Sequence, residues 1–377
     1  MCYTGGMIQS LYRVPDYTQE KVSAAVRAIM EDHDIRSKVS PGMKVVLKPN
    51  RIMAKSPQFP VTTHPAVVRA VAQYLRSIGV TDIVLAESSG GPYTAEYMKG
   101  VYRTCGMEAL KDVLTLNDDF SSVPVACKSG FKNHSFNIIR PVVQADFLIN
   151  ICKLKTHAMT GYSGGIKNLF GVIPGLEKPQ MHYRWPDIED FSTMLLELAQ
   201  TVHPGLTIID AIDAMEGNGP TGGTAHPLGL LLGAEDFFTQ DYFALSLMQM
   251  EPESVVMIRQ AVEQGLARPA ELELKGDAVP EGLTAFKLPD TVALDFSDSL
   301  PGIFGKLFVK IASRILKSYP QVDKEKCIGC ARCQESCPSH IIRMEGGKAV
   351  FRKKGCISCF CCQEMCPRQA IYVKKAL

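Results

Sequence analysis

The sequence predicts an α/β body with a mostly parallel sheet, built as one lobe or as two, followed by a small α+β domain. Two observations predict this fold. Strand-like and helix-like patterns alternate along residues 17–292, as they do where crossover helices join parallel strands. Nine of the 13 cysteines then fall between Cys327 and Cys366. We therefore expect a body over residues 1–300, a connector over 301–320 and a cysteine-rich domain over 321–377.

The expected elements of the body follow from the period of its apolar residues. Helices are expected over residues 20–33, 65–78, 188–202, 239–250 and 254–263. Strands are expected over residues 44–47, 82–86, 136–139, 146–152, 206–210 and 228–232. Ligands bind at the carboxyl ends of the strands in an open α/β sheet. Polar residues that directly follow these strands are therefore the first candidates for a site.

The connector is expected to be an amphipathic helix. Between residues 303 and 319 the apolar side chains share one face, and the opposite face carries Lys306, Lys310, Arg314 and Lys317. The apolar face suits packing against the body. The basic face would also suit docking to an acidic redox partner or to a membrane surface.

Charge and composition argue against several classes of protein. Lys and Arg number 41 and Asp and Glu 39, so the charge balance does not favour a nucleic-acid partner. No apolar run of about 18 residues indicates a transmembrane segment. Residues 1–10 lack the charged and apolar regions of a signal peptide. The cytoplasm is therefore the expected location.

The cysteines near the C-terminus form two copies of one motif, C-x2-C-x2-C-x3-C-P. This is the spacing of four-iron four-sulfur ligation, in which the fourth cysteine of each copy serves the other cluster. One cluster is therefore assigned to Cys327, Cys330, Cys333 and Cys366, and the other to Cys356, Cys359, Cys362 and Cys337. Paired zinc sites are the alternative, although zinc needs neither the third close cysteine nor the proline. The ninth cysteine of this region, Cys361, belongs to neither set.

The last 57 residues resemble bacterial ferredoxins that hold two [4Fe-4S] clusters. The resemblance implies a ferredoxin-like fold, transfer of single electrons, and an electron donor protein or another redox partner. We expect an oxygen-sensitive protein of an anaerobe or a facultative anaerobe. Clusters with a structural or sensing role are the alternative.

The most polar segment of the body, residues 150–182, follows an expected strand. Its candidate site residues are Lys153, Lys155, His157, Gly164, Gly165, Lys167, Asn168 and His182. Glycines let backbone amides approach an anionic group closely, and the lysines favour such a group by charge. The expected ligand is therefore a small anion.

Further candidates follow neighbouring strands. They are Lys48, Asn50, Ser88, Asp210 and Glu216. Taken singly, each also has a purely structural explanation, since Glu216, for example, fits a solvated loop charge. No G-x-G-x-x-G follows an expected strand, and neither a P-loop nor a serine hydrolase elbow is present, so a dinucleotide or nucleoside triphosphate site is not supported. Flavin stays open.

Five segments of the body carry a resemblance to a known family. They are Lys48 to Asn50, Thr63 to Pro65, Lys153 to His157, Ser163 to Gly175 and Asp210 to Gly217. Together they resemble the family called domain of unknown function 362 (DUF362), whose members often end in a ferredoxin tail like this one. The family name implies no activity.

Residues 157–167, with Ser163-Gly164-Gly165 ahead of Lys167, resemble the cofactor segment of nickel-pincer lactate racemases. The resemblance implies that Lys167 carries a cofactor and that His157 and His182 act in catalysis. Ile166 stands where that family has an arginine. A further cofactor in the body, nickel or flavin, is therefore left open.

Three functions fit these patterns. The first is a redox enzyme that passes electrons between its clusters and an anion held by the lysines, with His157 or His182 supplying protons. The second is an electron-transfer or binding module without chemistry of its own. The third is a racemase-like isomerase with a metal-organic cofactor on Lys167. The first accounts for both parts of the chain and is our working hypothesis.

Overall fold

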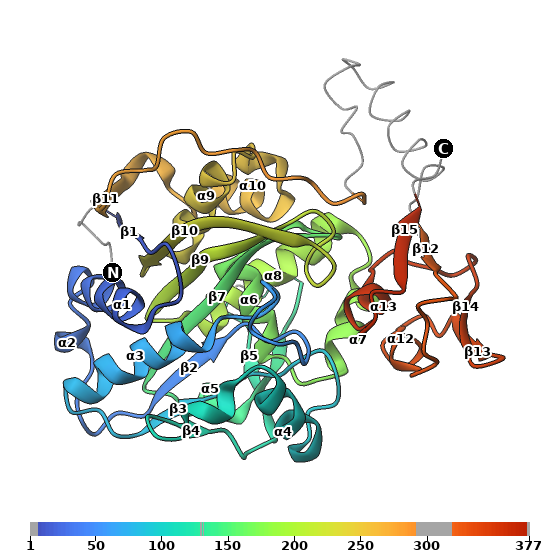
Figure 1. Ribbon diagram of the computed structural model, residues 1–377, viewed down its shortest axis with the longest axis horizontal. Helices are drawn as coiled ribbons and strands as arrows, with labels where there is room; N and C mark the ends of the chain where they lie inside the picture. The colour runs from blue at the N-terminus through green and yellow to red at the C-terminus, as the bar shows by residue number, and fades with distance from the viewer. Residues whose placement is uncertain (1–6, 129, 131, 292–318, 375–377) are drawn as a thin grey trace.

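The computed structural model describes residues 7–128, 130, 132–291 and 319–374. Figure 1 shows a large α/β body with a small C-terminal domain beside it. The sheet of the body is mostly parallel. The predicted fold class is therefore confirmed.

One sheet runs through the whole body. Its strands are β1 (Met7–Arg13), β2 (Val45–Pro49), β3 (Ile83–Leu85), β4 (Thr115–Leu116), β7 (Phe147–His157), β8 (Gly161–Ser163), β9 (Leu206–Glu216), β10 (Thr224–Ala234) and β11 (Leu272–Gly276). They lie in the order β11–β1–β10–β9–β7–β2–β3–β4, with β8 paired to β7. From β9 to β4 neighbouring strands are parallel, whereas β10 is antiparallel to both β9 and β1. The carboxyl ends of β2, β3, β7 and β9 therefore meet at one edge.

Helices cover both faces of this sheet. They are α1 (Gln19–Asp32), α2 (Ile35–Lys38), α3 (Pro65–Ser77), α4 (Ala95–Thr104), α5 (Arg140–Val143), α6 (Gly165–Asn168), α7 (Glu177–Arg184), α8 (Ile188–Val202), α9 (Phe237–Leu247) and α10 (Val256–Glu263). On one face α1, α3 and α4 pack with Val45 and Leu47. On the other, α8, α9 and α10 pack with Val46. Alternate strand residues point to opposite faces, so a sheet covered on both sides has strands that are apolar throughout.

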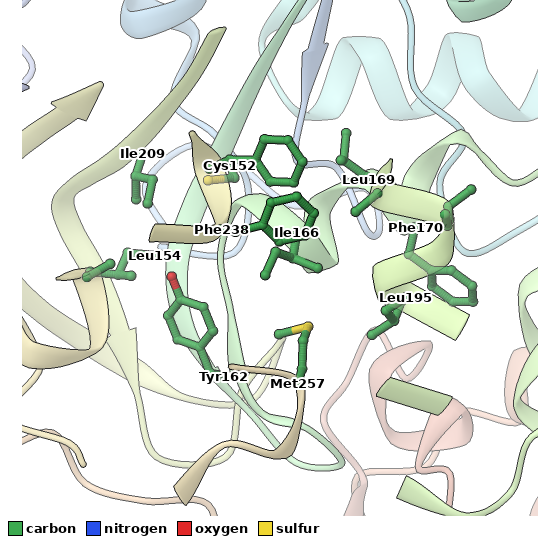
Figure 2. Close-up of a cluster of buried hydrophobic side chains, with 14 of the residues drawn as sticks. Cys152, Leu154, Tyr162, Ile166, Leu169, Phe170, Leu195, Ile209, Phe238 and Met257 are labelled. Atoms are coloured by element: carbon green, nitrogen blue, oxygen red, sulfur yellow. The ribbon is translucent and has the colours of Figure 1, made fainter. Parts of the chain in front are cut away.

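Figure 2 shows part of the apolar cluster on the second face. Cys152 and Leu154 of β7 and Ile209 of β9 lie near Ile166 of α6 and Phe238 of α9. Cys152 is 1% exposed and packs here as a small, buried apolar side chain. Burial of such side chains contributes roughly 25 cal/mol per Å² of apolar surface. This packing fixes α6 against the sheet.

The sequence located the long helices well and the central strands less well. The helix expected over residues 188–202 is α8 with those same ends. β7 and β9, however, continue to His157 and Glu216, beyond the expected ends at residues 152 and 210. Charged residues at both expected ends, Lys153 after the first and Asp210 in the second, favour a loop by local pattern. The strand expected over 136–139 is β6 (Ser135–Ile139), which pairs with β5 (Ser122–Ala126) in a separate hairpin.

The C-terminal domain has two antiparallel strand pairs and two short helices. These are β12 (Tyr319–Val322) with β15 (Ile371–Lys374), β13 (Ile342–Glu345) with β14 (Lys348–Phe351), α12 (Arg332–Glu335) and α13 (Cys361–Glu364). The connector helix expected over 301–320 lies outside the described residues up to residue 318, and residues 319 and 320 belong to β12. Within the described ranges no helix has the length and apolar character to cross a membrane.

The packing of α8 makes one prediction about stability. Leu195 is 1% exposed inside the second cluster, whereas Leu288 is 50% exposed. Leu195→Ala should lower the free energy of unfolding by about 2–5 kcal/mol because it removes buried methyl groups and leaves a cavity. Leu288→Ala, the matched control, should change it by less than about 0.5 kcal/mol. Denaturant titration under anaerobic conditions measures both, and equal losses would contradict this description of the core.

Candidate functional site

A cavity lies between the body and the C-terminal domain. It encloses about 620 Å³, part of which is open to solvent. Both parts of the chain line it, the body through α6, α7 and the loops after β2 and β3, and the C-terminal domain through α13. The predicted site residues among its lining are Asn50, Ser88, Lys167, Asn168 and His182. The C-terminal domain contributes Ser336, Cys361, Glu364 and Met365.

The turn from β8 into α6 places Lys167 at this cavity. Asp241 of α9 accepts hydrogen bonds from the backbone N–H groups of Gly165 (2.7 Å) and Ile166 (2.9 Å) and from the Tyr162 hydroxyl (2.9 Å). A Cβ atom at Gly164 would lie 2.0 Å from the Tyr162 oxygen, so only glycine fits there. Burial raises the pKa of Asp241 to about 6, and its three donors oppose that rise. The Gly165 amide, expected to face a ligand, is therefore engaged inside the protein.

Lys167 is nearly buried and has no internal partner. It is 8% exposed, and its Nζ lies 5.6 Å from the ring centre of Phe170. Among the described residues, no ion pair or hydrogen bond engages its ammonium group. Burial lowers the pKa of Lys167, and the nearby Glu364 carboxylate opposes that effect. An ammonium group at a cavity without a partner is available to an anionic ligand.

Lys178 of α7 is the second lysine of the cavity lining. Its Nζ donates to Ser88 Oγ (3.1 Å) and to the Ser89 carbonyl (3.0 Å). Burial lowers its pKa to about 7, although Glu87 opposes the shift. Near neutral pH this group therefore exists in both protonation states.

A buried ion pair supports the floor of the cavity. Lys48 of β2 pairs with Glu87, which follows β3. The Lys48 side chain is fully buried and the Glu87 side chain is 4% exposed. Burial lowers the pKa of Lys48, and Glu87 opposes that effect. A Cβ atom at Gly171 would lie 2.1 Å from Glu87 Oε1, so glycine lets the chain pass close to this pair. The Arg51 guanidinium adds positive charge near Glu87 and lies 4.4 Å from the ring centre of Tyr102.

His157 makes the contact between body and C-terminal domain. Its Nδ1 accepts hydrogen bonds from the backbone N–H groups of Met159 (3.1 Å) and Thr160 (3.3 Å). The ring hydrogen of the neutral imidazole is therefore on Nε2, which lies 3.1 Å from Oε1 of Glu364. Burial lowers the pKa of His157 to about 4, so the ring is neutral at pH 7. Its Nδ1 is thus hydrogen-bonded inside the body, whereas its Nε2 lies at ion-pair distance from Glu364 without the geometry of a hydrogen bond.

His182 differs from His157 because it lines the cavity and, among the described residues, has no carboxylate at ion-pair distance. Its ring stacks on Phe191, with ring centres 4.3 Å apart, and its buried Nδ1 has no hydrogen-bond partner in the described part of the chain. Burial lowers its pKa to about 3. A neutral imidazole with an unpartnered nitrogen at the cavity can exchange a proton with a ligand.

Lys155 lies behind the cavity and supports two residues of its lining, Asn50 and Asn168. Lys155 Nζ donates to Asn50 Oδ1 (2.8 Å), and Asn50 Nδ2 donates to Asn168 Oδ1 (2.9 Å). Burial lowers the pKa of Lys155 to about 7. Asn168 Nδ2 donates in turn to Asn150 Oδ1 (2.7 Å). This chain of amides fixes the orientation of Asn50 and Asn168, which do line the cavity.

The remaining predicted residues are placed elsewhere. Lys153 pairs with Asp210 at 3.0 Å, next to the Tyr17 hydroxyl. Glu216 accepts from the Lys287 backbone N–H (3.0 Å) and contacts His226 (2.9 Å). Neither group lines the cavity. The structure therefore separates these residues from Lys167 and His182.

Four residues of the site were not among the predicted ones. Lys178 lies inside the polar segment 150–182, and that position was its only signal in the sequence. Asp241 lies on α9, whose mostly apolar sequence predicts a helix packed in the core and gives no sign of a site residue. Cys361 belongs to neither copy of the cysteine motif. Glu364 lies between two motif cysteines, and nothing in that position predicts a role in the cavity. No local pattern indicates that these side chains meet.

Four of the cysteines in the repeated motif lie around one hollow of the C-terminal domain. A hollow of about 340 Å³ is lined by Cys327, Cys330, Cys333 and Cys366 among others. In the second set, burial followed by the charges of Cys359, Cys337 and Cys356 raises the pKa of Cys362. Over the described ranges, no three metal-binding side chains converge as they would on a single ion. Four sulfurs around a hollow fit a cubane cluster, and these residues would hold it.

The two cysteine sets differ in their surroundings. Cys330 of the first set is exposed, whereas Cys337, Cys359 and Cys362 of the second are buried. Ser336 and Cys361, which adjoin two ligands of the second set, line the large cavity. The second set is therefore the one beside the cavity.

Two family models match the chain. The first, domain of unknown function (DUF362), matches residues 45–246, which is more than half of the chain. The second, 4Fe-4S dicluster domain, matches residues 319–367.

Two curated proteins are similar in sequence. The thylakoid-associated protein sll1697 of Synechocystis sp. is 31% identical over 320 residues, covering 82% of this chain and 95% of that protein. Ferredoxin-2 of Desulfomicrobium norvegicum is 48% identical over 29 residues, which is 8% of this chain and 49% of the ferredoxin. This second match supports iron-sulfur ligation by the C-terminal domain.

Among the solved structures that align with the chain is the lactate racemase apoprotein of Thermoanaerobacterium thermosaccharolyticum. It aligns with a TM-score of 0.38 and 12% identity, over 63% of this chain and 57% of the racemase chain.

The His157–Glu364 contact predicts how the C-terminal domain is seated. Glu364→Lys should weaken the seating because the new ammonium would face Lys167 and the two histidines. Hydrogen–deuterium exchange of residues 157–182 in the full chain should then become faster. Glu335→Lys is the matched control, since Glu335 ends α12 as Glu364 ends α13 but is exposed. Equal exchange in both variants, at unchanged iron content, would contradict the seating role.

The lowered pKa of Lys178 predicts a pH-dependent affinity for anions. Its usual value is 10.5 and its value here is about 7, so the ammonium is charged below pH 7 and neutral above it. Sulfate, whose charge is constant over this range, should bind about tenfold more weakly at pH 8.5 than at pH 6, because a charge-assisted hydrogen bond is lost. Lys178→Arg, which stays charged, should remove most of this dependence. Calorimetric titration of both proteins measures it.

Proposed function

The chain belongs to the DUF362 family and carries a 4Fe-4S dicluster domain, and we propose that it is a redox enzyme acting on an anionic substrate or cofactor held in the cavity. Two four-iron clusters, when bound, supply single electrons one at a time. The observation that carries the proposal is that one cavity is lined both by Lys167 and Lys178 of the body and by Ser336 and Cys361, the sequence neighbours of predicted cysteine ligands.

Lys167 and Lys178 bind the anion in this proposal. Their ammonium groups lie in surroundings that exclude most water, where a charge contact is stronger than in bulk solvent. Reduction adds negative charge to a bound group, and the same ammonium groups stabilise that charge as it develops. Asn50, Asn168 and Ser88 then orient the bound group through hydrogen bonds.

His182 supplies or accepts the proton that accompanies the electrons. Its Nδ1 is unpartnered, whereas both nitrogens of His157 face protein groups. His157 therefore acts as a positioning residue that meets Glu364. His157 and His182 therefore have separate roles, although the sequence-based prediction gave both the same catalytic role.

Reoxidation kinetics test the proposal. The full chain, reduced under anaerobic conditions, is mixed with small carboxylates and phosphates that contain a reducible C=C or C=O bond, and the recovery of cluster absorbance is followed. Lys167→Met should slow reoxidation by an active acceptor about 100-fold or more, because it removes a charge that stabilises the transition state. Lys167→Arg should recover part of the rate.

Iron content of about eight atoms per chain in every variant is the required control. Equal rates in the wild type and in Lys167→Met would overturn the proposal and favour a carrier without chemistry of its own.

A second function is favoured by one observation. The amine of Lys167 has no partner and its pKa is lowered, as is typical of lysines that form covalent bonds with a cofactor. A racemase-like enzyme with a cofactor on Lys167 would show a mass increase on the peptide that contains this residue, in protein from the native host. Arginine could not replace such a lysine, so the rate of Lys167→Arg separates the two functions.

A further inference from the structure

The two halves of the C-terminal domain repeat one sequence pattern but have different surroundings. Cys327-Ile328-Gly329-Cys330 of the first half corresponds to Cys356-Ile357-Ser358-Cys359 of the second. Ile328 is 61% exposed and Cys330 is exposed, whereas Ile357 is partly buried and Cys359 is 8% exposed. The second half faces the body through Glu364. The first half is therefore the one open to a partner.

Ile328 is an unusual surface residue. No other large apolar side chain in the described ranges is as exposed. It lies between two cysteines of the first set, at the rim of the hollow that they line. Apolar side chains in the centre of an interface, surrounded by polar ones, are typical of protein–protein contacts.

The C-terminal domain carries more positive than negative charge. Residues 319–374 contain ten Lys and Arg but five Asp and Glu. Lys326 precedes Cys327, Lys348 Nζ donates to the Cys327 carbonyl (2.6 Å), and Arg368 lines the same hollow as Ile328. Of the carboxylates nearby, Asp323 lies 3.5 Å from Lys326 and is offset by it. The three basic side chains Lys326, Lys348 and Arg368 would attract an acidic partner to this face.

We propose that an acidic electron-carrier protein docks on the face formed by Ile328, Lys326, Lys348 and Arg368. In this transfer the carrier would lose one electron and the iron-sulfur centre that Cys327, Cys330, Cys333 and Cys366 would hold would gain it, with no bond formed or broken. The reverse transfer uses the same face. The inference rests on the proposed function only in taking this domain to exchange electrons, because docking does not involve the cavity.

Stopped-flow reduction of the oxidised full chain by a reduced acidic flavodoxin tests the docking face. The second-order rate constant should fall as salt is added, because exposed charges are screened. Ile328→Ser should lower it about tenfold, and Lys326→Glu combined with Arg368→Glu should lower it further and weaken its salt dependence. Ile357→Ser, the matched substitution in the second half, should leave it unchanged.

Two further measurements keep the outcome clear. Dithionite should reduce wild type and every variant equally fast, which shows that the clusters are intact. Calorimetric titration with oxidised flavodoxin should show binding to the wild type at low salt and about tenfold weaker binding to Ile328→Ser.

Wild-type rates in the Ile328 and charge-reversal variants would overturn the docking face. Binding to anionic lipid vesicles without any effect of these variants on flavodoxin would also overturn it, in favour of a membrane surface. No step of these tests uses a substrate or Lys167, so their failure would leave the proposed redox function standing. Loss of reoxidation in Lys167→Met tests that function separately.

Discussion

The structure depends on the burial of several lysine ammonium groups at the carboxyl end of its parallel strands. Transfer of an ammonium group from water to the protein interior costs several kcal/mol of desolvation free energy, and contacts with partner groups offset this cost. Glu87 pairs with Lys48, Asp210 with Lys153, and Asn50 accepts from Lys155. These contacts join β2, β3, β7 and β9 at one edge of the sheet. Lys167, which lines the cavity, has no hydrogen-bond or ion-pair partner within the described residues, and this is why the cavity suits an anion.

The C-terminal domain completes the same electrostatic arrangement. Burial alone would raise the pKa of Glu364, but His157, Lys167 and His182 lower it overall. The carboxylate of one domain thus offsets part of the positive charge of the other. Met365 packs at Gly90, where a Cβ atom would lie 2.6 Å from its sulfur, and Gln369 Nε2 donates to the Thr221 carbonyl (2.9 Å). These contacts bring the second cysteine set to the cavity.

The parts that could be predicted are those that local spacing encodes. Residues 188–202 form α8 as expected, because a helix depends on contacts three and four residues apart. β7 was expected to end before Lys153, since charged side chains are normally exposed to solvent and a strand in the middle of the sheet is buried. They are buried here because their partners come from other strands. Asp241 was missed for the same reason, as it meets Gly165 from a position 76 residues away.

The sequence by itself determined the α/β class, the 4Fe-4S character of the C-terminal domain and the segment that carries Lys167, because each of these depends on residues close together in the chain. Only the tertiary structure decided which lysines are paired, which histidine lines the cavity and which half of the C-terminal domain faces the body. Those outcomes depend on contacts such as His157 with Glu364, and no local pattern specifies a contact between residues so far apart.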